Sequence, residues 1–309
     1  MSGIGERPKK PSYDWRGDGP SRTDPWPRHR KRSPGAAASS RRLLPYHELP
    51  EWYRDNQFIH HGYRPVSHSI RACLASWRYL HNETFNIYSH LVPALLFLLA
   101  AGAFNRSLQA RYPDATGSDH AVFAFFLLTA VIALGMSATY HTLINHSHRV
   151  CDLSLRFDLI GIVIRTLGDF VSGIYMGFYC ESTLKRTYWA MLNHRFQGRR
   201  WRTLRACVFV ATGLSGFAPL IHGIVLFGFP QTMKRSGMPC YLGEGLLLIL
   251  GAILYTTRIP ESLWPGRFDL FGSSHQIFHI TVVLGTTIHL MGILSAFDYH
   301  YRQGTCRLS

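Results

Sequence analysis

The stretch AVFAFFLLTAVIALGMSATYHT, residues 121–142, decides the fold of this chain. A helix needs about 20 predominantly apolar residues to cross a hydrocarbon core about 30 Å thick, and this run supplies them. It ends with Ser137 and His141, which lie four residues apart and therefore share one face of a helix. A membrane helix thus carries a hydroxyl and an imidazole to the edge of the bilayer, where ionisable side chains are costly.

Other apolar segments extend this pattern along the chain. Five of them qualify, or nearly qualify, as membrane helices: residues 86–104, 157–178, 204–229, 241–257 and 276–296. The mean hydropathy of the whole chain is close to zero only because a polar N-terminal region offsets these segments. We therefore predict an all-α fold, a polytopic membrane helix bundle over residues 85–300, with a short C-terminal tail over 301–309.

The N-terminal region is polar and basic. Residues 1–45 are rich in Pro, Gly, Ser and Arg and bury too little apolar surface to fold, so a disordered tail is predicted. The tail lacks an apolar segment of the kind that a cleavable signal peptide carries. By the positive-inside rule, RHRKR at 28–32 with Arg41 and Arg42 places it in the cytosol. The organelle is not specified by these features.

A juxtamembrane segment, residues 46–84, joins the tail to the bundle. Apolar side chains recur in it at three- and four-residue spacing, at Ile70, Cys73, Leu74, Trp77 and Leu80. This spacing predicts an amphipathic helix over 65–81, lying on the cytosolic face of the membrane.

Net charge and cysteine usage exclude several classes of protein. The formal charge is +15, but the basic residues lie in the tail and in loops, with no nucleic-acid-binding module around them, so no nucleic-acid partner is expected. The six cysteines form no C-x-x-C pair, which argues against a zinc ribbon. Cys180 and Cys240 fall on the same predicted side; a disulfide between them is open, but two unrelated thiols are favoured.

The number of spans presents a problem near residue 190. The loop at 193–205 carries five arginines and should be cytosolic, yet only TYWAMLN, residues 187–193, separates it from the outer end of the preceding span. Seven residues of helix reach about 10 Å, too little to cross a bilayer. We therefore predict a seven-transmembrane plan whose fourth span is truncated around 187–194.

This truncation decides on which side of the membrane the last span begins. With only six crossings, His275 and His279 would lie a membrane thickness away from His141 and Asp158. Either the short segment returns the chain as a half-span, or the sequence is a splice variant or a faulty gene model with a disabled site. The second alternative is favoured, because irregular backbone exposed to lipid is not tolerated at membrane depth.

Chemically active side chains gather at three predicted helix ends: Ser137, His141, Asp158, His275 and His279. Three imidazoles with one open position are typical of catalytic zinc, and a carboxylate beside them could accept a proton from water. Histidines that merely hydrogen-bond at the membrane interface are the alternative. The combined pattern of histidines, serine and aspartate favours zinc.

Several motifs carry a family resemblance: DNQFIHHGYRP (55–65), HNETFNIYSH (81–90), SATYH (137–141) with Asp158, the PE and PGRFD elements (260–269) and SSHQIFH (273–279). Together they resemble the progestin and adipoQ receptor family, which includes adiponectin receptors, bacterial haemolysin III and fungal homologues linked to zinc and sterol homeostasis. That family is similar to alkaline ceramidases. The resemblance implies that His141, His275 and His279 bind zinc, that Asp158 contacts it through water, and that Ser137 lines the site.

Other polar residues lie within the apolar segments. Arg165 and Asp169 are four apart and predict a buried ion pair, with a substrate carboxylate at Arg165 as a second interpretation. His222 could line a cavity inside the bundle together with these residues, although packing beside Pro219 is the favoured interpretation. His289 lies too far along its helix from His279 to join the metal.

Two functions remain open at this point. The leading hypothesis is zinc-dependent hydrolysis of a ceramide-like lipid amide, with Asp158 as proton acceptor and an apolar cavity for the acyl chains. The alternative is a receptor in which zinc is structural and a ligand shifts the bundle between two states. Either function implies a lipid substrate or ligand, while a protein ligand stays unidentified. A pore is unsupported, since no ring of charged residues is evident.

Overall fold

The computed structural model describes residues 42–184 and 217–304. The regular secondary structure of these residues consists of helices and one isolated antiparallel bridge between Leu44 and Tyr63. Five helices are long and apolar enough to cross a membrane: α3 (Thr84–Arg111), α4 (Gly117–Leu143), α5 (His148–Gly177), α10 (Met238–Thr257) and α11 (Ser274–Gln303). The predicted all-α membrane bundle is confirmed.

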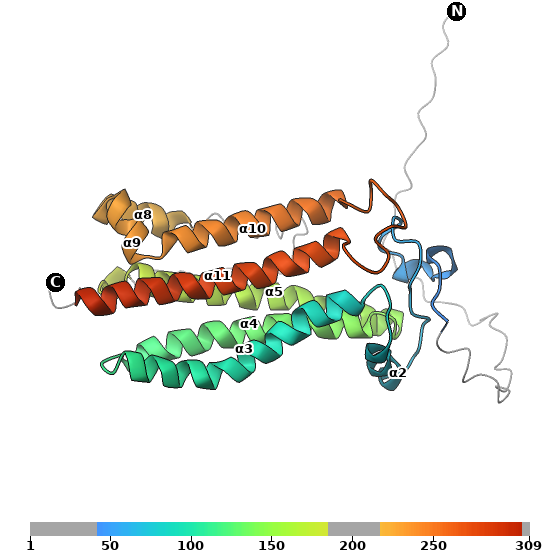
Figure 1. Ribbon diagram of the computed structural model, residues 1–309, viewed down its shortest axis with the longest axis horizontal. Coiled ribbons are helices and arrows are strands. Elements are labelled where there is room, and N and C mark those ends of the chain that lie inside the picture. Colours follow the sequence, from blue (N-terminus) through green and yellow to red (C-terminus); the bar gives the residue numbers. More distant parts are fainter. Residues whose placement is uncertain (1–41, 185–216, 305–309) are drawn as a thin grey trace, which may run out of the picture. The chain divides into compact units, whose positions relative to one another are not determined.

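The five long helices run side by side (Figure 1). Helix α4 packs between α3 and α5, and α10 packs along α11. Helix α11 also contacts α3 and α5, so it joins the two groups. This arrangement brings the C-terminal end of α4 and the N-terminal end of α11 together at the end of the bundle where α2 lies (Figure 1).

The bundle exposes many large apolar side chains and buries several polar ones. Leu99, Val225 and Leu246 expose 69–76% of their surface, whereas Thr286 and His289 are buried. A soluble protein rarely exposes large contiguous apolar surface, but a helix surrounded by lipid must do so. The distribution of polarity therefore supports a protein that crosses the membrane several times.

Small residues allow the helices to approach closely at two positions. A Cβ atom at Gly168 of α5 would overlap the Thr129 hydroxyl of α4, and one at Gly251 of α10 would overlap the Thr281 hydroxyl of α11. Small residues at such crossings are typical of membrane helices, where van der Waals contact drives association.

Two shorter helices follow the gap in the described residues. They are α8 (Phe217–Phe227) and α9 (Phe229–Arg235), separated by Gly228 in the left-handed region at φ 76°. The predicted span at 204–229 is described only from residue 217 onward. The predicted truncated span at 187–194 lies outside the described residues, as does the predicted tail up to residue 41. The prediction of a disordered tail up to residue 45 is wrong at its end, because Leu44 pairs through its backbone with Tyr63.

The juxtamembrane segment forms short helices in place of the predicted long one. They are η1 (Tyr46–Glu48), η2 (Glu51–Tyr53), α2 (Ile70–Ala75) and η3 (Ser76–Arg78). The helix predicted over 65–81 is too long at its start because Ser67 and His68 donate backbone hydrogen bonds to Asn145 and His146, which keeps them out of a helix. Helix α2 begins only where the Ser69 side chain caps it.

The cysteines differ in part from the prediction. Cys240 is a free thiol, as are the buried Cys73 and Cys151, but Cys180 is disulfide-bonded. The favoured interpretation of Cys180 and Cys240 as two unrelated thiols is therefore wrong for Cys180, and the alternative bridge between these two residues is not formed. Their placement on one predicted side of the membrane carried no information on distance.

Candidate metal centre

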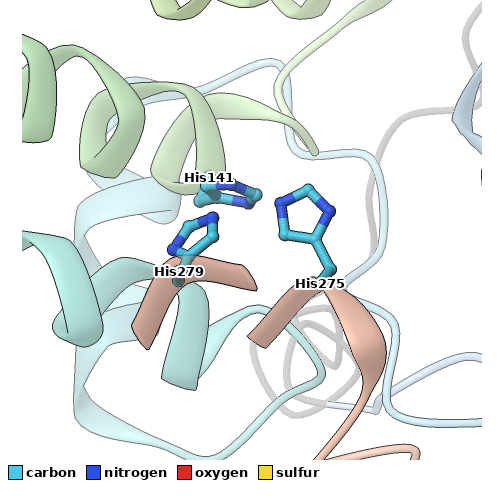
Figure 2. Close-up of side chains that lie close together, drawn as sticks. All are labelled: His141, His275 and His279. Carbon is cyan, nitrogen blue, oxygen red and sulfur yellow. The ribbon is translucent and has the colours of Figure 1, made fainter. Parts of the chain in front are cut away.

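Three histidine rings from two helices point toward one another (Figure 2). His141 lies in the last turn of α4, while His275 and His279 lie in the first two turns of α11. Their ring centroids are 4.8–5.0 Å apart, and one ring nitrogen of each lies within 4.8 Å of the others. We call these three residues the metal centre. The rings meet, so the separation expected from a disabled fourth span does not occur.

The tautomers of these rings suit a metal ion. His141 Nδ1 lies 2.8 Å from Glu83 Oε2, and the buried His141 Nε2 has no hydrogen-bond partner among the described residues. His279 Nδ1 lies 3.1 Å from Ser89 Oγ, whose hydroxyl is also placed to donate to the Asn86 carbonyl at 3.2 Å. With Ser89 donating to that carbonyl, His279 Nδ1 would donate to Ser89 Oγ, and its Nε2 would keep a lone pair for an ion. Neutral imidazoles with inward lone pairs are good zinc ligands, so the donor set fits zinc.

Glu83, directly before α3, holds His141 in this tautomer. Its carboxylate also accepts hydrogen bonds from Asn86 Nδ2 at 2.7 Å and Asn82 Nδ2 at 3.2 Å. Burial would raise the pKa of Glu83, but hydrogen bonding to His141 and Asn86 outweighs burial and lowers the pKa to about 2. A carboxylate behind a metal-binding histidine fixes the ring and makes it a more basic ligand. Sequence reasoning missed Glu83, although it lies in the HNETF motif.

Asp158 and Ser137 lie beside the histidines. The carboxylate of Asp158 hydrogen-bonds with Ser137 and interacts electrostatically with His141. Asp158 was expected to open its span, but it lies ten residues inside α5, because that helix begins at the polar residue His148. The predicted site residues Ser137, His141, Asp158, His275 and His279 therefore occupy one region at the α2 end of the bundle.

Helix α3 adds a fourth imidazole that the sequence did not assign. The His90 ring stacks on the His279 ring, with centroids 3.8 Å apart and planes inclined by 12°. His90 Nε2 lies 3.3 Å from the His279 carbonyl oxygen, and both residues are buried. The contact fixes the His279 ring from the side of α3. The only sequence signal for it was the motif HNETFNIYSH, which ends at His90.

A buried arginine closes the C-terminal end of α4. The Arg64 guanidinium donates to the carbonyl oxygens of His141 at 2.6 Å and Thr142 at 3.1 Å, and to Ser76 Oγ at 2.7 Å. The last carbonyls of a helix carry partial negative charge, so a cation there is stabilising. Arg64 thus anchors the juxtamembrane segment to the turn that carries His141. Sequence reasoning missed this residue too.

A small polar cavity lies next to the metal centre. Its volume is about 60 Å³, and its lining includes Tyr53, Asn82, Asn86, His141 and His275. The amide oxygens of Asn82 and Asn86 are buried and unpartnered in the described protein. A polar space of this size holds on the order of four waters, which would satisfy such atoms, but it is too small for a lipid.

An apolar cavity lies elsewhere, between α3 and α4. Its volume is about 300 Å³, and it is lined by residues such as Leu98, Phe104, Phe123 and Val131. Val131 precedes His141 by ten residues of helix, or about 15 Å. The apolar cavity is therefore separate from the metal centre in the described part of the chain.

The remaining predicted residues lie away from the metal centre. Arg165 and Asp169 form the expected ion pair, which is confirmed. His289 does not join the three histidines, also as expected, and it pairs with Glu244 at 2.6 Å. His222 of α8 has its ring 5.7 Å from that of Phe178, so it lies against the C-terminal end of α5.

Comparisons with known proteins agree with this arrangement. The family described as haemolysin-III related matches residues 78–290. The chain is 36% identical over 280 residues to the adiponectin receptor protein of Drosophila melanogaster, covering 87% of this chain and 62% of that one. It is 37% identical over 270 residues to the ADIPOR-like receptor IZH2 of Saccharomyces cerevisiae, covering 84% and 85%.

A nematode protein matches to a similar extent. Progestin and adipoQ receptor-like protein 1 of Caenorhabditis elegans is 38% identical over 264 residues, covering 82% of this chain and 60% of the relative. The chain thus spans about three fifths of the fly and nematode relatives and most of the yeast one.

Proposed function

Since this chain belongs to the haemolysin-III related family of adiponectin receptor-like membrane proteins, we propose that it is a zinc-dependent hydrolase of a lipid amide of the ceramide type. Its products would be a fatty acid and a sphingoid base. The bundle would lie with the N-terminal tail and the metal centre on the cytosolic side, because the basic residues of the tail precede the first span.

One observation carries the proposal: the ring nitrogens of His141, His275 and His279 lie within 4.8 Å of one another, and the buried His141 Nε2 has no partner in the described protein. A carboxylate and a hydroxyl, those of Asp158 and Ser137, lie beside them. Three protein ligands leave a fourth position for water or substrate. Bound there, zinc would polarise a carbonyl and lower the pKa of a coordinated water to about 7.

The chain's own residues would position and move protons around that ion. Asp158 would accept a proton from the attacking water and return it to the amine that leaves. Ser137, hydrogen-bonded to Asp158, would orient this carboxylate. Glu83 would hold the His141 ring in place, and His90 would hold the His279 ring. The small polar cavity would supply water while excluding acyl chains.

The test is amide hydrolysis by the purified full chain. A ceramide in mixed micelles is incubated with the protein before and after chelation, and released fatty acid is measured. We expect turnover that chelation abolishes and zinc restores. Asp158→Asn should lose at least 100-fold in turnover while retaining zinc, because a proton acceptor contributes about 10²–10⁴. Turnover that survives chelation, or that Asp158→Asn leaves unchanged, would rule out the proposed mechanism.

A receptor with structural zinc is the second candidate function. It is favoured by the names of the fly and yeast relatives, both of which are called receptors. In that case the metal centre would tie α4 to α11, and a ligand would act by preferring one arrangement of the bundle. The same chelation experiment separates the two candidates: structural zinc predicts loss of thermal stability on chelation from a protein that shows no turnover at any zinc concentration.

A further inference from the structure

A second group of ionisable side chains lies deeper inside the bundle. We call it the inner cluster; it consists of Arg165, Asp169, Glu244 and His289. The residues come from three helices, α5, α10 and α11. His289 follows His279 by ten residues of α11, which places the inner cluster about 15 Å further into the membrane-spanning part than the metal centre.

Arg165 is the permanent cation of the inner cluster. Its guanidinium pairs with Asp169 on its own helix and, at 2.8 Å, with Glu244 Oε1 across the bundle. Its Nε donates to Thr286 Oγ1 at 3.0 Å. All three guanidinium nitrogens therefore have partners, and one positive charge faces two carboxylates.

The hydrogen bonds of His289 fix one of its protons. His289 Nε2 lies 2.9 Å from Ser172 Oγ. The Ser172 hydroxyl has one proton and lies near two carbonyl oxygens, that of Gly168 at 2.8 Å and that of Asp169 at 3.2 Å, and serines within helices commonly donate to such carbonyls. With its proton directed at a carbonyl, Ser172 Oγ accepts from His289, so in this arrangement Nε2 carries a hydrogen.

The other nitrogen of His289 then requires a second proton. His289 Nδ1 lies 2.6 Å from Glu244 Oε2 and 3.6 Å from Asp169 Oδ1. A lone pair facing a carboxylate at 2.6 Å would be repulsive, so a proton must lie between Nδ1 and Oε2, on either atom. Charge requires the same proton: Arg165 supplies one positive charge against two negative ones, and an uncompensated charge is costly inside a membrane protein.

We propose that the inner cluster is a proton-binding site within the membrane-spanning part, in which one exchangeable proton shared by His289 and Glu244 makes the cluster neutral. A metal ion does not fit in its place. Zinc bonds to nitrogen and oxygen are about 2.0–2.2 Å long, which leaves no room for an ion between atoms 2.6 Å apart, and the Arg165 cation already occupies the other side of both carboxylates.

The surroundings of His289 contain no further charge among the described residues. Helix α4 contributes the Phe126 ring, stacked on the imidazole at 4.8 Å, and α10 contributes the Tyr241 ring at 4.9 Å in addition to Glu244. Helix α5 contributes Arg165, Asp169 and Ser172, and α11 itself adds Thr286, which binds Arg165. Loss of the proton would thus leave one negative charge among α5, α10 and α11. Of these helices, α5 carries Asp158 and α11 carries His275 and His279.

The proposal is tested on the full chain in lipid bilayers by ¹⁵N NMR of labelled histidines, with His289→Gln used to assign the His289 signals. At neutral pH we expect His289 Nε2 to be protonated and Nδ1 to share a proton. As pH rises, one proton should leave, and the thermal unfolding midpoint should fall because the folded state then buries a net charge. Glu244→Gln removes one of the two negative charges. In this variant His289 should not lose a proton as pH rises, and the thermal unfolding midpoint should not fall for that reason.

Three results would overturn the proposal. The first is an unprotonated Nε2 at all pH values, since Ser172 would then be the donor and no additional proton would be needed. The second is a His289 titration that Glu244→Gln leaves unchanged. The third is a second equivalent of zinc that binds the wild-type protein and that Glu244→Gln eliminates. Glu51→Gln, at an exposed residue of η2, is the control, and His289 should titrate in this variant as it does in the wild type.

Discussion

The metal centre and the inner cluster contain similar side chains but differ in how their charges are balanced. Each brings together three groups that could bind a metal. The metal centre has no internal cation, and its buried His141 Nε2 has no partner among the described residues. The inner cluster contains Arg165, and both nitrogens of His289 are hydrogen-bonded.

This difference shows that proximity of ligand-type side chains does not by itself define a metal site. Imidazoles with inward lone pairs need an external cation, whereas two carboxylates that face a guanidinium need only a proton to reach neutrality. The two regions share helix α11 but no side chain, so each can be altered separately within one protein.

The largest expected effect separates the two regions by their zinc content. His141→Ala should reduce bound zinc from one ion per chain to nearly none, because two imidazoles seldom hold zinc against dilution. His289→Gln should retain the full amount. Elemental analysis of both purified variants measures this difference. Equal zinc loss in the two variants would contradict the claim that the metal centre binds zinc and the inner cluster does not.

Removal of the cation from the inner cluster should have the next largest effect. Arg165→Met leaves two buried carboxylates without their counter-charge and should lower the free energy of unfolding by about 3–5 kcal/mol. Adding Glu244→Gln to Arg165→Met should restore part of this loss. Denaturant titration in micelles measures it. Arg111→Met, at an exposed ion pair at the end of α3, is the control and should change the free energy by at most about 1 kcal/mol.

Glu83, whose carboxylate contacts His141, should affect the zinc affinity of the metal centre without being a zinc ligand itself. Glu83→Gln should weaken zinc affinity by about 10–100-fold, because a neutral amide orients the imidazole but no longer makes it a stronger base. Competition with a chelator of known affinity measures the change. Glu51→Gln should leave the affinity at the wild-type value, and an unaffected affinity in Glu83→Gln would assign Glu83 a purely structural role.

The smallest expected effect concerns the close approach of α10 to α11 at Gly251. Gly251→Ala should destabilise the bundle by about 1–2 kcal/mol, since its Cβ would meet the Thr281 hydroxyl of α11. Gly245→Ala on the same helix has open space at its Cβ and should be neutral or slightly stabilising. Thermal unfolding of the two variants compares them. Equal midpoints would show that α10 and α11 adjust freely at this crossing.

The length of the apolar runs predicted the long helices well but misplaced their ends. The helix predicted at 241–257 is Met238–Thr257, while the one at 157–178 begins at His148 and the one at 276–296 continues to Gln303. Polar residues at helix ends continue the backbone hydrogen bonding beyond the apolar core of the bilayer. Hydropathy therefore reports membrane thickness more directly than helix length.

The site was predictable where its residues lie on one helix face. Ser137 with His141 and His275 with His279 are both four apart, and Arg165 with Asp169 likewise. Glu83, Arg64 and Glu244 were missed because their partners belong to distant segments and meet only through helix packing.

The most direct test of the metal centre is zinc X-ray absorption spectroscopy on purified, well-folded wild-type protein. We predict one zinc per chain with three nitrogen ligands at about 2.0–2.1 Å and one oxygen ligand, and loss of this signal in His275→Ala. Folded protein that contains no zinc, or zinc whose ligand set is unchanged in His275→Ala, would contradict the assignment of His141, His275 and His279 as the metal ligands.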